Sequence, residues 1–79
     1  MNDPIRMFLY EGKVHSCSPK AKFLVETANS TSSYTLARGF GCEPNVALQF
    51  YEELQVGANQ RKRLTVIDGG TRTVLARTK

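Results

Sequence analysis

The amino-acid sequence predicts a single α+β domain, in which one α-helix packs on one face of an antiparallel β-sheet of four to six strands. Short alternating segments typical of strands fill the chain up to residue 40, and a helical repeat follows at 44–56. A Gly-Gly pair between two β-forming runs then predicts a C-terminal hairpin. The expected order is therefore β-β-β-β-α-β-β. A chain of 79 residues has room for one hydrophobic core, so we assign residues 1–79 to one domain.

The first half of the chain carries four predicted strands. Ile5–Tyr10 and Lys13–Cys17 flank a Glu-Gly turn signal, and Pro19 ends the second segment because proline donates no backbone hydrogen bond. Lys22–Thr27 and Tyr34–Phe40 are two further segments, separated by a polar loop of Asn, Ser and Thr residues. In each pair, we expect the second strand to return antiparallel to the first.

The first predicted strand alternates between an aliphatic face and a mixed face. We expect one of these faces to be buried and the other to be partly covered. The aliphatic face carries Ile5, Met7 and Leu9, and the mixed face carries Arg6, Phe8 and Tyr10.

The helix is predicted to run from Pro44 to Val56. Proline suits the first helical position, where its missing N–H would be unpaired in any case. Gly57 follows where a left-handed C-terminal cap is expected. Acidic and amide side chains fill the outer side of the helix, so the positive charge of the protein must lie on strands and loops. The apolar stripe that should face the sheet consists of Ala47, Phe50, Tyr51 and Leu54.

The C-terminal hairpin joins Leu64–Ile67 to Thr73–Ala76 through a loop of five residues. We expect Leu64 to lie opposite Ala76 and Val66 opposite Val74, because a slip by one residue would mix Arg72 into the apolar set. Two faces follow from this register. The apolar face would carry Leu64, Val66, Val74 and Ala76, and the other face Thr65, Ile67, Thr73 and Leu75.

Basic residues crowd the ends of this hairpin, and the chain carries a net charge of +4 with a pI near 9.4. This balance favours an anionic partner, although a solvated surface explains the same charge equally well. The segment Arg61–Arg63 is the densest cluster, and Lys20 and Lys22 extend it if their strand lies beside the hairpin. The predicted partner-binding residues are Arg61, Lys62, Arg63, Arg72, Arg77, Lys20 and Lys22.

The sequence predicts neither an enzyme nor a metal or cofactor site. His15, Cys17 and Cys42 are the only soft metal ligands, and a zinc site needs four ligands, commonly in paired spacing. No spacing selects a nucleophile, a base and an orienting group. The segment 39–41 resembles half of a phosphate-binding loop but lacks the third glycine and the lysine.

Targeting signals are also missing from the sequence pattern. The N-terminus opens polar and acidic, and no apolar run reaches the length of a secretion signal or a membrane span. We therefore expect a cytoplasmic protein that does not bind membranes. In that compartment thiols stay reduced, so we expect Cys17 and Cys42 to be unpaired.

Eight residues of the predicted hairpin, together with the predicted helix before them, carry a resemblance to a known family. These hairpin residues are Leu64, Val66, Asp68, Gly69, Gly70, Val74, Leu75 and Ala76. In this pattern, which covers about half of the chain, the sequence resembles the compact single-domain anti-CRISPR proteins of phages and mobile elements, some of which pack one helix on an antiparallel sheet. The resemblance implies a non-enzymatic inhibitor that occupies a surface of a nucleoprotein complex, often where DNA would bind. The basic charge departs from the acidic DNA mimics of that group.

The chain also resembles the β-grasp fold, which places a helix between two hairpins, although the first strand pair of this chain is harder to fit to that fold. Two functional hypotheses follow. The first hypothesis is an anti-CRISPR-like phage protein, a monomer or weak dimer, which blocks a protein or nucleoprotein complex such as a CRISPR effector by steric occupancy through its basic face. The alternative is a small nucleic-acid-binding module that uses the basic hairpin 61–79 on phosphates.

Overall fold

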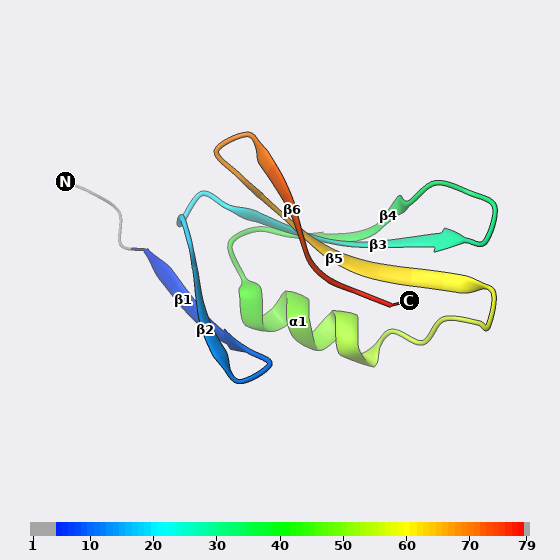
Figure 1. Cartoon of the computed structure of the whole chain (residues 1–79). Helices are drawn as coiled ribbons and strands as arrows, with labels where there is room; N and C mark the ends of the chain where they lie inside the picture. Colours follow the sequence, from blue (N-terminus) through cyan, green and yellow to red (C-terminus); the bar gives the residue numbers. More distant parts are fainter. Residues whose placement is uncertain (1–4, 79) are drawn as a thin grey trace.

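A computed structural model, which describes residues 5–78, has one α-helix and six β-strands in the predicted order (Figure 1). The fold class is α+β, and both sheets are antiparallel. One sheet is a hairpin of two strands, and the other has four strands in the order β4-β3-β5-β6. The elements are β1 (Arg6–Tyr10), β2 (Lys13–Cys17), β3 (Lys22–Asn29), β4 (Thr35–Phe40), α1 (Pro44–Glu53), β5 (Gln60–Asp68) and β6 (Thr71–Arg77).

The helix and the β1–β2 hairpin pack on the same side of the four-stranded sheet (Figure 1). Val25 of β3 lies opposite Leu64 of β5, and both side chains are fully buried under α1. Phe8 of β1 reaches the same core, where its ring meets the ring of Phe23 edge-on at 5.7 Å between centroids. No helix of residues 5–78 packs on the other side of the sheet, which we call the open face.

The turn of the β5–β6 hairpin is tighter than the sequence predicts. Asp68 pairs with Thr71, so only Gly69 and Gly70 form the turn, with φ values of 60° and 84°. Two successive residues at positive φ are typical of a type I′ turn, which fits the twist of the strands and favours glycine. Both strands are consequently longer than the predicted runs.

The predicted register of this hairpin is half right. Leu64 lies opposite Ala76 as expected, but Val66 lies opposite Thr73 and not opposite Val74. The register shifts immediately after Leu64, where an extra residue in β6 forms a β-bulge. The predicted register requires a regular ladder, and the bulge breaks that ladder.

The bulge changes which side chains of β6 face the core. Thr73 and Leu75 turn to the side of the β1–β2 hairpin, although the sequence argument put them on the opposite side. Val74 turns to the open face, where 39% of it is exposed. The predicted apolar face therefore loses Val74 and gains Leu75.

The helix ends earlier than predicted, at Glu53. Phe50 is only half-buried and packs at the rim, with its ring 5.5 Å from the ring of Phe40. Gly57 is not a left-handed cap, since it is not among the residues with positive φ. Instead, Leu54 donates its N–H to the carbonyl of Phe50. The fully packed side of the helix carries Pro44, Ala47, Leu48 and Tyr51.

The β1–β2 hairpin buries its mixed face and leaves its aliphatic face in solvent. Phe8 is 6% exposed, whereas Met7 and Leu9 on the other face are 68% and 65% exposed. The expected partial cover of this second face is therefore wrong for the aliphatic side. In the part of the chain that the structure describes, no helix has the length and apolar character needed to cross a bilayer.

Phe23 and Phe50 are buried to different extents, which gives a test of this packing. We expect Phe23→Ala to lower the free energy of unfolding by about 3–5 kcal/mol, because it leaves a cavity in a fully buried site. Phe50→Ala at the rim should cost only about 1–2 kcal/mol. Urea denaturation of both variants measures the difference. Equal losses would mean that the helix lies on the sheet in another orientation.

Candidate functional site

The open face presents three rows of side chains that run across strands β3, β5 and β6. Each row follows from the register, because directly opposed residues point to the same face of a sheet. A carboxylate stands in the middle of the face among several cations. The rows are Lys22–Ile67–Arg72, Leu24–Thr65–Val74 and Glu26–Arg63–Arg77.

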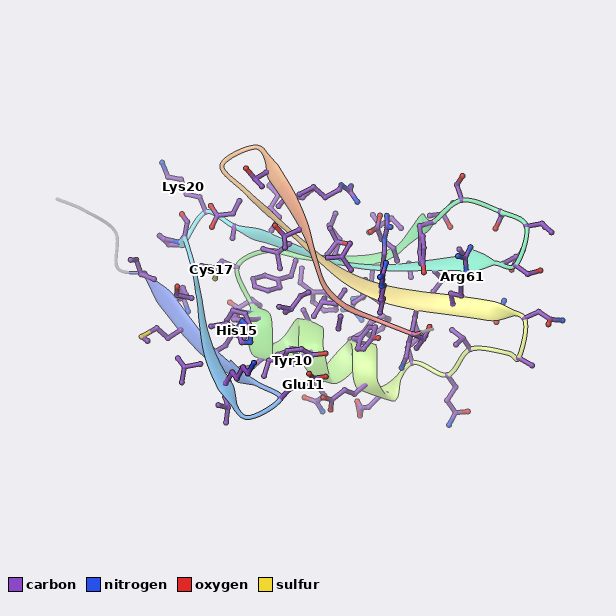
Figure 2. The ribbon with its side chains drawn as sticks, in the orientation of Figure 1. Tyr10, Glu11, His15, Cys17, Lys20 and Arg61 are labelled. Atoms are coloured by element: carbon purple, nitrogen blue, oxygen red, sulfur yellow. The ribbon has the colours of Figure 1, made fainter. Side chains whose placement is uncertain are left out.

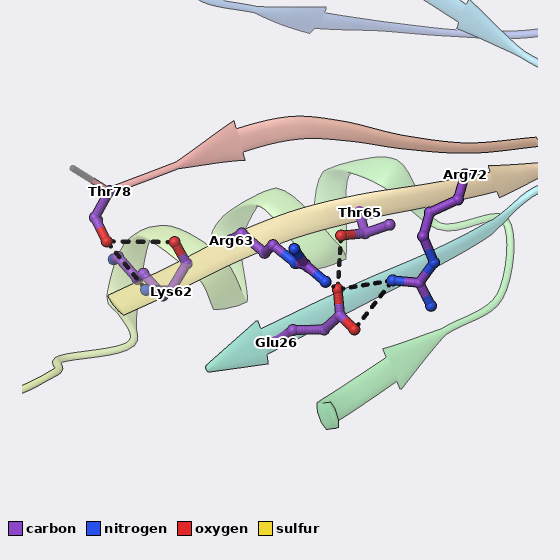
Figure 3. Close-up of polar contacts among 6 residues, drawn as sticks. All are labelled: Glu26, Lys62, Arg63, Thr65, Arg72 and Thr78. Carbon is purple, nitrogen blue, oxygen red and sulfur yellow. Dashed lines mark hydrogen bonds and ion pairs between the residues drawn. The ribbon is translucent and has the colours of Figure 1, made fainter. Parts of the chain in front are cut away.

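Glu26 is the centre of the open face and is only 6% exposed (Figure 3). Arg63 donates Nε–H to Oε1 of Glu26 at 2.9 Å, and the hydroxyl of Thr65 donates to the same oxygen at 2.7 Å. Arg72 Nη1 lies 3.2 Å from both carboxylate oxygens. Residues from β3, β5 and β6 therefore meet at one buried carboxylate, which we call the Glu26 network.

Two opposing effects act on the pKa of Glu26. Burial raises the pKa, because it penalises the charged form of a carboxyl group. The hydrogen bonds from Arg63, Thr65 and Arg72 lower it, and together they outweigh burial, so the pKa lies below its ordinary value of 4.5. Glu26 is therefore a carboxylate at neutral pH, and both guanidinium groups keep a fixed anionic partner.

A tyrosine joins the arginines of the open face. The guanidinium carbon of Arg63 lies 3.9 Å from the centroid of the Tyr34 ring, and that of Arg61 lies 5.1 Å from it. Arg61 also donates from Nη2 to the carbonyls of Asn29 at 3.0 Å and Ser32 at 3.3 Å. These contacts hold the β3–β4 loop and the side chain of Arg61 in place.

Lys62 points away from the open face and contacts the C-terminal end of the helix instead. Its ammonium group donates to the carbonyls of Tyr51 at 2.6 Å and Leu54 at 2.9 Å. Cations at the C-terminus of a helix pair with unsatisfied carbonyls and with the negative end of the helix dipole. The backbone of Lys62 pairs with Thr78 (Figure 3). Lys62 thus takes the capping role that the sequence assigned to Gly57.

The seven predicted binding residues do not form one cluster. Lys20 and Arg61 lie at opposite ends of the molecule (Figure 2), whose longest extent is 46 Å. Strand β3 does lie beside β5, the condition under which Lys22 extends the basic surface. Within residues 5–78, four of the seven side chains form hydrogen bonds or ion pairs: Arg61, Lys62, Arg63 and Arg72. The side chains of Lys20, Lys22 and Arg77 form none with these residues.

Sequence reasoning missed two residues of this surface. Glu26 lies in the predicted strand Lys22–Thr27 on the face of Leu24, with no functional role assigned, yet it organises the open face. Tyr34 begins the predicted strand Tyr34–Phe40, yet its ring lies beside two arginines. The signal for Glu26 is that it is the one acid in its predicted strand, because such a residue needs a cationic partner when it is buried.

A second feature is a shallow cleft of about 220 Å³ between the β1–β2 hairpin and the β5–β6 hairpin. His15, Cys17 and Asp68 contribute to its lining, and Figure 2 shows the first two on the hairpin. Asp68 uses one carboxylate oxygen to accept the backbone N–H of Ser18 at 3.0 Å. Among the residues described, no group of three histidine, cysteine or acidic side chains could hold a metal ion.

The two cysteines of the chain are neighbours, and Cys17 lines this cleft. Both are free thiols, with Cys17 Sγ 3.8 Å from Cys42 Sγ. Burial, together with the hydrogen bond to Cys42, raises the pKa of Cys17 to about 11. Cys17 is therefore protonated at neutral pH and is a poor nucleophile.

Comparison with known proteins identified no relative: no family model, no curated protein and no solved structure matches this chain. The arrangement of side chains on the open face is thus the basis for a functional proposal.

The Glu26 network gives a test by substitution. We expect Glu26→Gln to lower the free energy of unfolding at pH 7 by about 2–4 kcal/mol, because it leaves two arginines without their carboxylate. Glu53→Gln on the exposed side of α1 is the matched control and should change it by less than about 0.5 kcal/mol.

Acid titration of the parent and of Glu26→Gln extends this test. The folded pKa of Glu26 is below 4.5, so its stabilisation is complete above that pH and is lost as the pH falls through the folded pKa. The stability difference between the parent and Glu26→Gln should therefore shrink in acid. A constant difference down to low pH would contradict the ionised network.

Proposed function

We propose that the protein is a non-enzymatic, anti-CRISPR-like inhibitor that occupies a surface of a nucleoprotein complex with the open face of its sheet. The observation that carries the proposal is the Glu26 network. It holds Arg63 and Arg72 in fixed positions on a face that no helix covers. The nucleoprotein target and the mode of inhibition come from the resemblance to anti-CRISPR proteins.

Fixed arginines favour a binding role for this face. An arginine that is already held loses less side-chain entropy when a partner binds, and arginine is enriched where interfaces are strongest. Arg72 keeps 49% of its side chain exposed while it contacts Glu26, so its remaining N–H groups stay accessible. Leu36 and Val74 on the same face are 60% and 39% exposed and add apolar contact area.

The distribution of cations favours a protein surface over free nucleic acid. Binding to phosphates depends on cations that can each release a counterion. Four of the seven predicted residues already have partners inside the protein, and of these Arg72 stays exposed. Lys20, Lys22 and Arg77 are the exposed cations without such a partner among residues 5–78. Three such contacts give weak and salt-sensitive affinity.

Tyr34 favours a second candidate function, the binding of single-stranded nucleic acid. Proteins of that class stack bases on aromatic rings that stand beside a basic groove. The ring of Tyr34 is partly exposed and lies next to Arg61 and Arg63. A base would have to share or replace the guanidinium contact at 3.9 Å.

Capture experiments distinguish the two candidates. The tagged protein is incubated with purified CRISPR effector complexes and with bacterial lysates, with and without nuclease treatment. We expect capture of a nucleoprotein complex that survives nuclease, and a loss of at least about tenfold in affinity when Arg72 and Arg77 are both replaced by Ala. Lys13→Ala, at the turn of the β1–β2 hairpin, is the control and should bind like the parent.

Binding to naked DNA decides between the inhibitor and the nucleic-acid-binding module. We expect weak or no gel shift with duplex or single-stranded DNA at about 150 mM salt, where screening is strong. Submicromolar binding under these conditions, lost in Tyr34→Ala and with a salt slope that falls by about one unit for each cation removed, would establish the nucleic-acid module instead.

A further inference from the structure

The outer face of the β1–β2 hairpin is an exposed apolar surface. In the residues described, seven large hydrophobic side chains are exposed; three of them lie on this small hairpin, and a fourth, Ile5, directly precedes it. Their exposed fractions lie between 65% and 68%. We call this surface the hairpin patch, and it consists of Ile5, Met7, Leu9 and Val14.

The register explains why these side chains gather on one face. Leu9 lies opposite Val14 and Met7 lies opposite Ser16, so these residues share a face of the hairpin. Phe8, on the alternate face, is buried against the core. A two-stranded hairpin with apolar side chains on both faces leaves one face without cover, and exposed patches of this kind mark interaction sites.

We propose that the hairpin patch is the interface between two copies of this chain, packed face to face about a twofold axis. Four side chains that are two-thirds exposed present roughly 500 Å² of apolar surface, near the upper end for a typical monomer. Two copies would bury at most about 1,000 Å² in total, which is small for a specific interface. We therefore expect a weak dimer.

The chemistry of the patch fits a second copy. The side chains of this face carry no charge, so the centre of the patch offers nothing to select an anionic partner. They belong to Ile5, Met7, Leu9, Val14 and Ser16. A twofold contact is self-complementary, and the same flat face serves both copies.

The charged side chains of the two strands lie on the other face of the hairpin. Arg6 lies opposite Cys17 and Lys13 lies opposite Tyr10, and both pairs share the face of Phe8. The proposed contact is therefore apolar and contains no charge pair. The hairpin and α1 lie on the same side of the four-stranded sheet, so the dimer leaves both open faces accessible.

Sedimentation velocity over about 5–500 μM protein measures this association directly. We expect the parent to shift from monomer to dimer with concentration. Leu9→Lys and Val14→Lys should each raise the Kd at least about tenfold, because each puts an unpaired charge into an apolar contact. Leu36→Lys places the same change on the open face at a residue that is 60% exposed, and it should dimerise like the parent.

Thermal melts at low concentration verify that the lysine variants stay folded, as expected for changes at exposed positions. If Leu9→Lys does not fold, Val14→Lys gives the same measurement on the neighbouring strand.

A parent that stays monomeric at all concentrations overturns the proposal, and so does a loss of dimer in Leu36→Lys equal to that in Leu9→Lys. Binding of a monomeric parent to phosphatidylglycerol vesicles, abolished in Leu9→Lys, would make the patch a lipid-binding surface and would also overturn the proposal. None of these outcomes depends on the target of the open face.

Discussion

The ionised side chain of Glu26 is the constraint on which the open face depends. A carboxylate in the middle of a sheet is costly to bury unless cations and hydrogen-bond donors surround it. Arg63 and Thr65 of β5 and Arg72 of β6 supply these groups, so one side chain of β3 ties three strands together. A slip of β5 by one residue would turn Arg63 and Thr65 toward the helix and leave the carboxylate unpaired. The network therefore selects the register as well as the positions of the arginines.

The two sides of the four-stranded sheet have consequently different roles. On one side, α1 and the β1–β2 hairpin bury the apolar core around Phe23 and Leu64. On the other, arginine and tyrosine side chains cover the sheet in place of a second layer and present fixed cations to solvent. A sheet with one helix must leave a face uncovered, and in this chain that face carries the charge on which the proposed function rests. The hairpin patch is a separate surface on the opposite side of the sheet, which allows self-association and partner binding to coexist.

The sequence predicts the order of elements well because each depends on local patterns: alternation in the strands, a helical repeat after Pro44, and a Gly-Gly turn. The pairing of Leu64 with Ala76 also follows from such a pattern. The bulge in β6 and the end of the helix at Glu53 could not be predicted, since each depends on contacts made after the elements pack. The same holds for the candidate site. Counting cations identifies the basic residues, but only the packed structure reveals which contacts they make. The register of β3, β5 and β6 brings Arg63 and Arg72 to Glu26, and the packing of the helix on β5 brings Lys62 to the C-terminal carbonyls of α1.

The ionisation of Glu26 in the folded protein is the most direct test of this account. Carbon-detected NMR of the Glu26 side-chain carboxyl during an acid titration of the folded protein reports its pKa without any substitution. The account predicts a midpoint below 4.5, because the hydrogen bonds from Arg63, Thr65 and Arg72 outweigh the effect of burial. A midpoint above 4.5 would mean that burial dominates, that the arginines do not hold the carboxylate in solution, and that the open face lacks the fixed cations on which its proposed role depends.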